Sequence, residues 1–449
     1  MTHRGAWNSR WSFVLATTGS AIGLGNIWKL PYMIGVNGGS AFVLVYILSI
    51  LCVGIPLLMT EIMLGRRIQK NPIDAMKSLA KESSRSNNWK YVGAMGMLTG
   101  VMILCFYSVI GGWVLSYISS AIQVGFTGIT AEQSSANFGH LLASPLTLLF
   151  WHTLFMIITM GVVSRGVTSG LERANNFLIP ALFILLLILL GYSMSVGDMQ
   201  TSFDFMFTPD FSKITPITTL VALGHAFFSL SIGMGSIMVY GSYLKKDVSI
   251  SRTSIYVAVA DTLLGLLVGL AIYALVFANH LDPSEGPGLI FKTLPIAFGQ
   301  MPWGNFFGVL FFILVAFAAL TSAISLVEPT IAWVVENTRI NRKKTCLVLG
   351  LFIWSVGISV LLSFNVWQEV TIIFGLGIFD TLDKLTSTIM LPFGGLLMAI
   401  FAGYSMKKHH SKDELDLTEK TYNLWRIANN VIAPAAICSV FLYLLNIAQ

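Results

Sequence analysis

The chain has 449 residues, of which 55% are apolar and only 11% are charged. This composition excludes a soluble globular protein, in which charged residues are far more common. Runs of about 20 apolar residues mark helices that cross a bilayer, and eleven such runs follow one another along the chain. We therefore expect an all-helical membrane protein. The predicted spans are 11–35, 40–64, 91–122, 147–164, 174–195, 217–243, 252–279, 304–336, 345–363, 373–404 and 424–446.

The orientation follows from the basic residues. Of the 27 Lys and Arg residues, all but Lys29, Lys213, Lys292 and Lys384 lie near the amino terminus or in the loops after the even-numbered spans. Since Lys and Arg accumulate on the cytoplasmic side, the amino terminus is predicted to be cytoplasmic and the carboxyl terminus outside. The net charge of +6 expresses this bias, so it does not indicate nucleic-acid binding.

The first span lacks the features of a cleaved signal peptide, so we expect it to be retained. It carries the sequence SAIGLGN at its middle, residues 20–26. Irregular backbone is tolerated in a membrane only where it lines a cavity or is buried in protein, which favours a broken helix here. Alternatively, Gly23 and Gly25 only allow neighbouring helices to approach closely.

A second interruption occurs in the sixth span, where Ser229, Ser231, Gly233 and Gly235 break the apolar run. If residues 11–195 and 217–404 form two inverted repeats of five spans each, the breaks occupy corresponding positions, with span 424–446 outside the repeats. Paired breaks indicate a binding site near the bilayer midplane, where helix ends offer carbonyls to cations and amides to anions. The whole chain, 1–449, is predicted to be a single domain built around this site.

Several motifs carry a specific resemblance: GSAIGLGNIWKLPY, NGGSAF, GIPLLMTEIMLGRR, AFFSLSIGMGSIMVYGSY, GPGLIF and AALTSAISLVEP. On these the chain resembles the neurotransmitter:sodium symporter family, and within it the bacterial multi-substrate hydrophobic amino-acid transporters. The resemblance implies a leucine-transporter-like fold in a bacterial inner membrane. It also implies sodium-coupled import of neutral, hydrophobic amino acids by alternating access, with no covalent reaction catalysed.

The resemblance also implies a substrate site. Family members that carry biogenic amines have an aspartate where this chain has Gly23, so a glycine favours a ligand that brings its own carboxylate. Apolar neighbours favour an apolar ligand side chain, and the flexible Met234 could accept several sizes. The implied substrate-binding residues are Ser20, Ala21, Ile22, Gly23, Gly25, Tyr107, Phe228, Ser229, Ser231, Met234, Ala323 and Leu326.

Two sodium sites are implied in the same way. Site one would use Ala21, Asn26, Ser229, Asp261 and the carboxylate of the substrate. Site two would use carbonyls of Gly19, Ile22 and Ala318 with the hydroxyls of Thr321 and Ser322. Oxygen ligands of this kind suit a hard cation. From the residues alone, Thr321 and Ser322 would instead bond back to their own helix.

Chloride is not expected as a cofactor. Chloride-dependent relatives have a serine where this chain has Gly265, and Asp261 stands where many have asparagine. The fixed charge of Asp261 could therefore replace the anion.

The resemblance places gates on both sides of the site. On the outer side Lys29 would face Asp383 beside His225, and a histidine can titrate near neutral pH unless it is held neutral. On the inner side Arg4, Trp7, Tyr243 and Glu336 match a network, although an arginine and a tryptophan near a terminus are also typical interface anchors. Gly170 and Pro180 mark a segment associated with unwinding toward the inner sodium site, or else an ordinary proline kink.

Glu61 lies in an otherwise apolar span, where a lone charge is costly. We expect it to bond to the unwound backbone of span six, or else to reach water beside Arg66. The stretch 407–422 is interpreted as a solvated loop. The four cysteines are scattered, so we infer neither a metal site nor a disulfide.

Two other functions remain open at this stage. One is a proton-coupled amino-acid carrier of the same fold, which His225 keeps possible. The other is an amino-acid-binding sensor or channel that does not concentrate its ligand. The sequence makes no prediction of oligomeric state.

Overall fold

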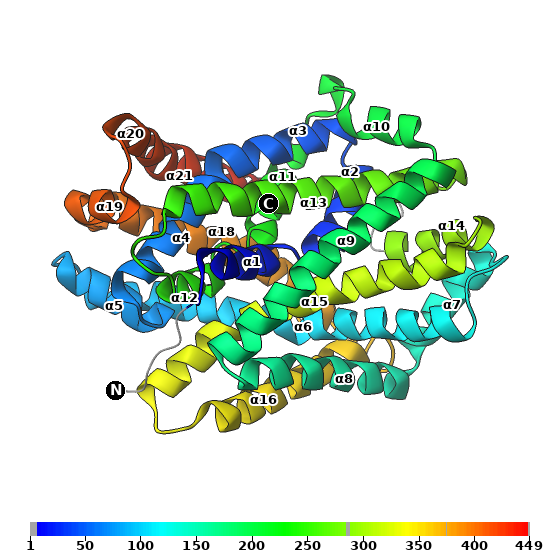
Figure 1. Ribbon diagram of the computed structural model, residues 1–449, viewed down its shortest axis with the longest axis horizontal. Coiled ribbons are helices and arrows are strands. Elements are labelled where there is room, and N and C mark those ends of the chain that lie inside the picture. The colour runs from blue at the N-terminus through cyan, green and yellow to red at the C-terminus, as the bar shows by residue number, and fades with distance from the viewer. Residues whose placement is uncertain (1–6, 284–287, 374, 448–449) are drawn as a thin grey trace.

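The computed structural model describes residues 7–283, 288–373 and 375–447, and in these ranges the chain is helical with no named strand (Figure 1). Nine helices of the described part are long and apolar enough to cross a membrane. They are α3–η2–α4 (Ser40–Ile68), η3–α6 (Asn87–Gln123), α8 (Pro145–Ser164), η4–α9 (Val167–Val196), α13 (Ile250–Ala278), α15 (Gly304–Asn337), α16 (Arg342–Leu362), α17–η8–α18–η9 (Ile378–Ser405) and α20–η10–α21 (Glu419–Leu442).

The two segments predicted to be broken helices are divided, which is why neither is among the nine. The first consists of α1 (Arg10–Ala21), η1 (Gly25–Lys29) and α2 (Leu30–Val36). The second consists of α11 (Pro216–Ser229) and α12 (Ser236–Ser242). The predicted interruptions are therefore present, while the total of eleven spans and the inverted repeat stay predictions.

The backbone explains both breaks. Helix α1 ends at Ala21, and the next residue, Ile22, is extended with φ −71° and ψ 99°. Between α11 and α12 three residues have positive φ: Ser231 at 55°, Gly233 at 89° and Gly235 at 76°. Glycine adopts this region without a Cβ penalty, whereas Ser231 does so at a cost of about 1–2 kcal/mol. The surrounding contacts must hold Ser231 in place.

Shorter helices connect the spans at the two ends of the bundle. They are α5 (Pro72–Glu82), α7 (Ala131–Ala143), α10 (Met199–Phe207), α14 (Leu294–Gln300) and α19 (Lys408–Leu415). Figure 1 shows α5 and α19 at one end and α7, α10 and α14 at the other, with α1 near the middle of the view. The breaks of α1 and α11–α12 thus lie inside the bundle.

Two sequence predictions are wrong. Residues 407–422 do not form a solvated loop, since α19 and the start of α20 occupy them. Arg66 anchors this stretch by donating from Nε to Glu414 at 2.6 Å, and both side chains are at most 10% exposed. The last predicted span but one, 373–404, begins its helix only at Ile378, because residues 370–373 and 375–377 are not helical. The many charged residues of 407–422 favoured a loop, but one of them, Glu414, forms a buried ion pair with Arg66.

Candidate substrate and sodium sites

A small cavity lies between the two breaks. Its lining comes from α1, η1, α6, α11, α15 and the residues joining α11 to α12: Ser20, Ala21, Gly23, Gly25, Ile103, Tyr107, Phe228, Ser231, Met234, Ser322 and Leu326. Nine of these are among the twelve implied substrate residues. Ile22, Ser229 and Ala323 do not line it, while Ile103 and Ser322 join it. Its free volume is about 20 Å³, so an apolar ligand would need Phe228 or Met234 to move.

Gly23 is required by close packing in this cavity. A Cβ at this position would lie 2.3 Å from Ser322 Oγ and 2.9 Å from the Tyr107 hydroxyl. Tyr107 also accepts a hydrogen bond from the Leu24 N–H at 3.0 Å. The cavity therefore has polar groups converging on a residue without a side chain, which is the arrangement that a ligand carboxylate could use.

All five implied ligands of site two come together, and one of them, Ser322, also lines this cavity. Thr321 Oγ1 lies 3.0 Å from the Ala318 carbonyl and 3.4 Å from the Ile22 carbonyl. Ser322 Oγ lies 3.4 Å from the Gly19 carbonyl and 3.3 Å from that of Ile22. The hydroxyl of Thr321 thus lies within hydrogen-bond distance of a carbonyl of its own helix, as the back-bonding alternative expects, and also of a carbonyl at the break in the first span.

This oxygen cluster fits a monovalent hard cation. Its members are buried, uncharged and drawn from two segments about 300 residues apart in the chain. Carbonyl and hydroxyl oxygens bind hard cations through their partial negative charge. Without a cation, several lone pairs would face one another with only two hydroxyl protons to share, so the donor set favours occupancy by an ion such as sodium.

The implied residues of site one form a second cluster with a different character. Asp261 accepts from Asn26 Nδ2 at 2.8 Å and from Ser229 Oγ at 2.5 Å. Its side chain is fully buried, and no basic side chain pairs with it in the part of the chain that the structure describes. A buried carboxylate held only by neutral donors is costly. A bound cation would neutralise it, so this cluster also fits sodium.

The structure adds residues that the sequence analysis missed. The Tyr46 hydroxyl lies 3.0 Å from Ser229 Oγ, so Tyr46 completes the polar cluster around Asp261. Ser20 donates to Ser325 Oγ at 2.8 Å, and Ser236 donates to the Ser325 carbonyl at 3.0 Å. Ser325 therefore joins both breaks to α15. A tyrosine inside an apolar span was the available signal for Tyr46, whereas Ser325 had none beyond its neighbours Thr321 and Ser322.

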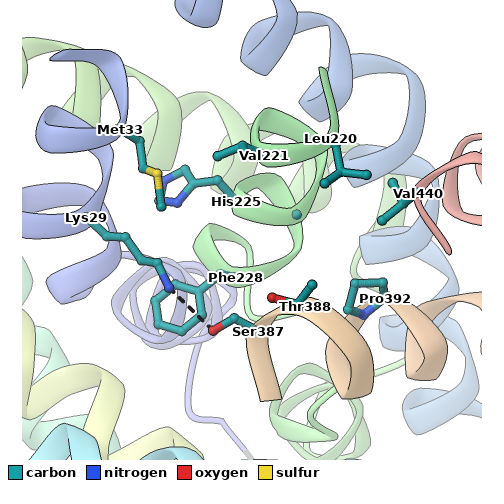
Figure 2. A pocket seen from close by; sticks show the side chains of 11 residues that line it. Lys29, Met33, Leu220, Val221, His225, Phe228, Ser387, Thr388, Pro392 and Val440 are labelled. Carbon is teal, nitrogen blue, oxygen red and sulfur yellow. Dashed lines mark hydrogen bonds between the residues drawn. The ribbon is translucent and has the colours of Figure 1, made fainter. Parts of the chain in front are cut away.

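On the predicted outer side, Lys29 Nζ pairs with Asp383 at 3.1 Å, the contact that the sequence analysis expects. Figure 2 shows Lys29 bonded to Ser387 and lying over the ring of Phe228, at 4.9 Å from the ring centroid. His225 lines the same outer pocket. Phe228 lines both this pocket and the inner cavity, so its ring separates them.

His225 is buried at 3% exposure, and neither ring nitrogen has a hydrogen-bond partner among the described residues. Its ring centroid lies 5.4 Å from that of Tyr46, between the outer pocket and the Asp261 cluster. Burial without a hydrogen-bond partner among the described residues disfavours the charged imidazolium, so this geometry favours a His225 that is held neutral.

The predicted inner side is closed around Trp7, which is 1% exposed. The indole N–H donates to the Tyr240 carbonyl at 3.1 Å, and the backbone N–H donates to the Tyr243 carbonyl at 3.3 Å. Glu336 accepts from Asn71 Nδ2 at 2.7 Å. Arg4, the fourth member of the implied network, lies outside the described residues.

Two further residues join this inner side. The Tyr243 hydroxyl donates to Glu328 Oε1 at 2.9 Å, and Arg342 pairs with the same carboxylate. Glu328 is fully buried in α15. The sequence analysis missed this pair because an acid and a base separated by 14 residues across a turn have no fixed periodicity.

The segment that contains Gly170 is wound in this structure. It forms η4, six π-helical residues, and Pro180 lies inside α9. A Cβ at Gly170 would lie 2.3 Å from the Val162 carbonyl, so close packing requires the glycine. Glu172 accepts from the Asn8 backbone N–H at 3.3 Å and from Asn8 Nδ2 at 3.1 Å. The residue after Trp7 is thereby tied to the start of α9.

Glu61 bonds to the break in the second divided segment. Its Oε1 accepts from the Gly233 N–H, as the sequence analysis expects, and its side chain is 1% exposed. The alternative in which Glu61 reaches water beside Arg66 is wrong, because the carboxylate is buried and Arg66 pairs with Glu414. Glu61 therefore stabilises the unwound backbone by satisfying an N–H that no helix partner can reach.

Comparison with known proteins identifies the family. The model of the Sodium:neurotransmitter symporter family matches residues 4–135 and 130–449, which together cover nearly the whole chain. The chain belongs to this family. Its members are sodium-dependent membrane transporters and not enzymes, which confirms the resemblance stated from the sequence.

Among similar members of the symporter family, an uncharacterized sodium-dependent transporter, YhdH, of Bacillus subtilis is 38% identical over 98% of both chains. The mouse sodium-dependent neutral amino acid transporter B(0)AT2 is 26% identical over 67% of this chain and 45% of its own length. A solved structure, the crystal structure of MhsT in complex with L-phenylalanine, matches with a TM-score of 0.91 and 42% identity, covering 98% of this chain and 99% of that one.

Proposed function

We propose that this chain imports neutral, hydrophobic amino acids coupled to the inward sodium gradient. The single observation that carries the proposal is the pairing of the oxygen cluster of site two with the cavity between the breaks, through the shared side chain of Ser322. The phenylalanine bound by MhsT, whose fold this chain shares, supports an amino acid as the ligand.

The chemistry of the cavity favours a zwitterion with an apolar side chain. Its polar groups gather around Gly23, where the Tyr107 hydroxyl and Ser20 could bond a carboxylate. The side chains of Ile103, Phe228 and Leu326 form an apolar wall, with Met234 as an adaptable surface. A charged ligand side chain would find no partner there and would lose its hydration.

Coupling is proposed to arise from the shared position of Ala21. It lines the cavity and is also an implied ligand of site one, whose Asp261, Asn26 and Ser229 lie within hydrogen-bond distance of one another. Bound sodium would supply the positive charge that holds a substrate carboxylate there. Asp261 lies on α13 and Ser229 on α11, so an ion shared with the substrate would stabilise one arrangement of these helices.

Alternating access needs a barrier on each side that can open separately. Lys29 and Asp383 close one side over Phe228, and Trp7 closes the other against Tyr240. A ligand can shift the population toward one state only by binding it more tightly. The residues of site two join α1 to α15. Binding or release of sodium there would therefore change how α1 packs on α15, and with it the stability of the barrier around Trp7.

The test is uptake of labelled phenylalanine, leucine and alanine into proteoliposomes, with and without an inward sodium gradient. Accumulation above equilibrium that disappears when sodium is equal on both sides supports the proposal. Uptake driven by a proton gradient in sodium-free buffer would instead favour the proton-coupled carrier, for which the unpartnered ring nitrogens of His225 are the specific observation. Uptake that never exceeds equilibration would favour a channel or sensor.

A further inference from the structure

A largely apolar groove of about 300 Å³ runs along the seam between α8 and α16, and none of its lining residues lines the cavity between the breaks. Figure 1 shows these two helices side by side at one edge of the bundle. Trp354 closes one end of the groove, where its indole N–H donates to Thr153 Oγ1 at 2.9 Å. Midway along α16, Gly350 leaves room for Met160, whose Cγ would lie 3.0 Å from a Cβ at that position.

The groove has the length of a lipid chain segment. Its α16 side extends from Cys346 to Trp354, which corresponds to about 12 Å of helix. Half of the hydrocarbon core of a bilayer is about 15 Å thick. A groove that follows the helices over this depth would hold an acyl chain of one leaflet, whereas a water-filled site would need polar partners that this lining lacks.

Basic residues gather at the Cys346 end. The Arg342 guanidinium donates from Nε to the Val163 carbonyl at 2.8 Å, which fixes the start of α16 against the end of α8. Arg165 follows α8 directly, and Lys343 and Lys344 lie in the first turn of α16; all three are exposed. No carboxylate pairs with these three in the described part of the chain, whereas Arg342 is held by Glu328.

We infer that this seam binds one anionic glycerophospholipid from the adjacent leaflet, with an acyl chain in the α8–α16 groove and its phosphate among Arg165, Lys343 and Lys344. Charge complementarity selects the headgroup, since each basic residue near a membrane surface attracts an anionic lipid. The apolar lining selects the chain. The site is independent of the proposed transport function, because none of its residues lines the cavity between the breaks.

The test uses native mass spectrometry of the full chain in detergent, incubated with equal amounts of dioleoyl phosphatidylglycerol and dioleoyl phosphatidylcholine. We expect one retained lipid per chain, predominantly phosphatidylglycerol. Leu351→Trp fills the groove from an exposed position and should remove this lipid. Val348→Trp is the matched control, because Val348 is exposed on the same helix but does not line the groove.

The charges are tested separately. Replacing Arg165, Lys343 and Lys344 with glutamine should lower the preference for phosphatidylglycerol on the order of fivefold for each charge removed. The double variant of Lys245 and Lys246 to glutamine, another exposed basic pair, should not change it. Equal retention of both lipids by the unmodified chain would overturn the inference, and so would Leu351→Trp retaining as much lipid as Val348→Trp. Elution as a single symmetric peak in size-exclusion chromatography verifies that each variant is folded.

Discussion

The two candidate sodium sites differ in the source of their negative charge. Site one contains a buried carboxylate, Asp261, held by Asn26 and Ser229, whereas site two contains only carbonyls and hydroxyls around Thr321 and Ser322. A fixed charge binds a cation strongly, but it costs free energy when the cation leaves. A neutral site releases its ion more readily. We therefore expect site one to hold its sodium for as long as the substrate is bound. Release of sodium from site two should come first and allow the conformational change.

The largest effect is expected from removing the hydroxyls of site two. Thr321→Val with Ser322→Ala should abolish sodium-driven accumulation, because each lost ligand should weaken sodium binding on the order of 10- to 100-fold. Sodium-dependent binding of labelled leucine to the purified protein measures this directly. The single variant Thr330→Val, on the same helix, is the control and should keep sodium dependence, because the Thr330 hydroxyl has no hydrogen-bond partner among the described residues. Equal sodium affinity in the double variant would contradict the assignment of site two.

Asp261→Asn tests the charge of site one. Removing it should raise the sodium concentration for half-maximal uptake by about tenfold or more, since the cation loses the negative charge that the protein supplies. Because site one is proposed to share its ion with the substrate carboxylate, the KM for leucine should rise as well. The site-two variant should change the sodium dependence of uptake and should change the KM for leucine less. If Asp261→Asn changed neither value, the two sites would not differ in the way proposed.

Gly23→Ala tests whether the cavity depends on a missing side chain. The added Cβ would lie 2.3 Å from Ser322 Oγ, so Ser322 or Tyr107 must shift. We expect leucine uptake to fall about tenfold, because the shift disturbs site two and the substrate cavity together. Gly191→Ala in α9 is the matched control, since a Cβ there meets nothing within 4 Å. Comparable uptake by the two variants would contradict the placement of the substrate at Gly23.

Glu172→Gln should have a smaller effect, on the route by which site two empties. The change keeps the shape of the side chain but weakens its bonds to Asn8, which tie the inner segment to α9. Loss of charge-assisted bonds costs about 1 kcal/mol, so cysteine labelling or proteolysis from the inner side should accelerate severalfold. Uptake kinetics under saturating sodium should change less. Unchanged accessibility would show that Asn8 and Glu172 do not restrain opening.

The smallest expected effect is that of chloride. A Cβ at Gly265 would lie 3.3 Å from Asn26 Nδ2, so a hydroxyl-bearing side chain there would reach site one, and glycine offers none. With Asp261 already supplying negative charge, replacing chloride by gluconate should leave sodium-driven uptake unchanged. A severalfold loss of uptake in gluconate would mean that an anion still serves site one.

Much of the architecture was predictable because its signals are local. Hydropathy located nine of the spans to within a few residues at most ends, although it placed the start of the span that begins at Ile378 too early. Glycine and serine clusters located both breaks, since positive φ at Gly233 and Gly235 is a property of those residues themselves. The resemblance then supplied the residues around the cavity, most of which the structure brings together.

The sequence by itself determined the membrane class, the family and the positions of the broken segments, because these depend on composition, short motifs and local backbone preference. Only the tertiary structure decided the partners of the buried polar groups. Tyr46 meets Ser229 across 183 residues and Asn8 meets Glu172 across 164. Such pairs leave no periodic signal in the chain, because they depend on how helices pack, and it is packing that decides which buried oxygens and nitrogens must satisfy one another.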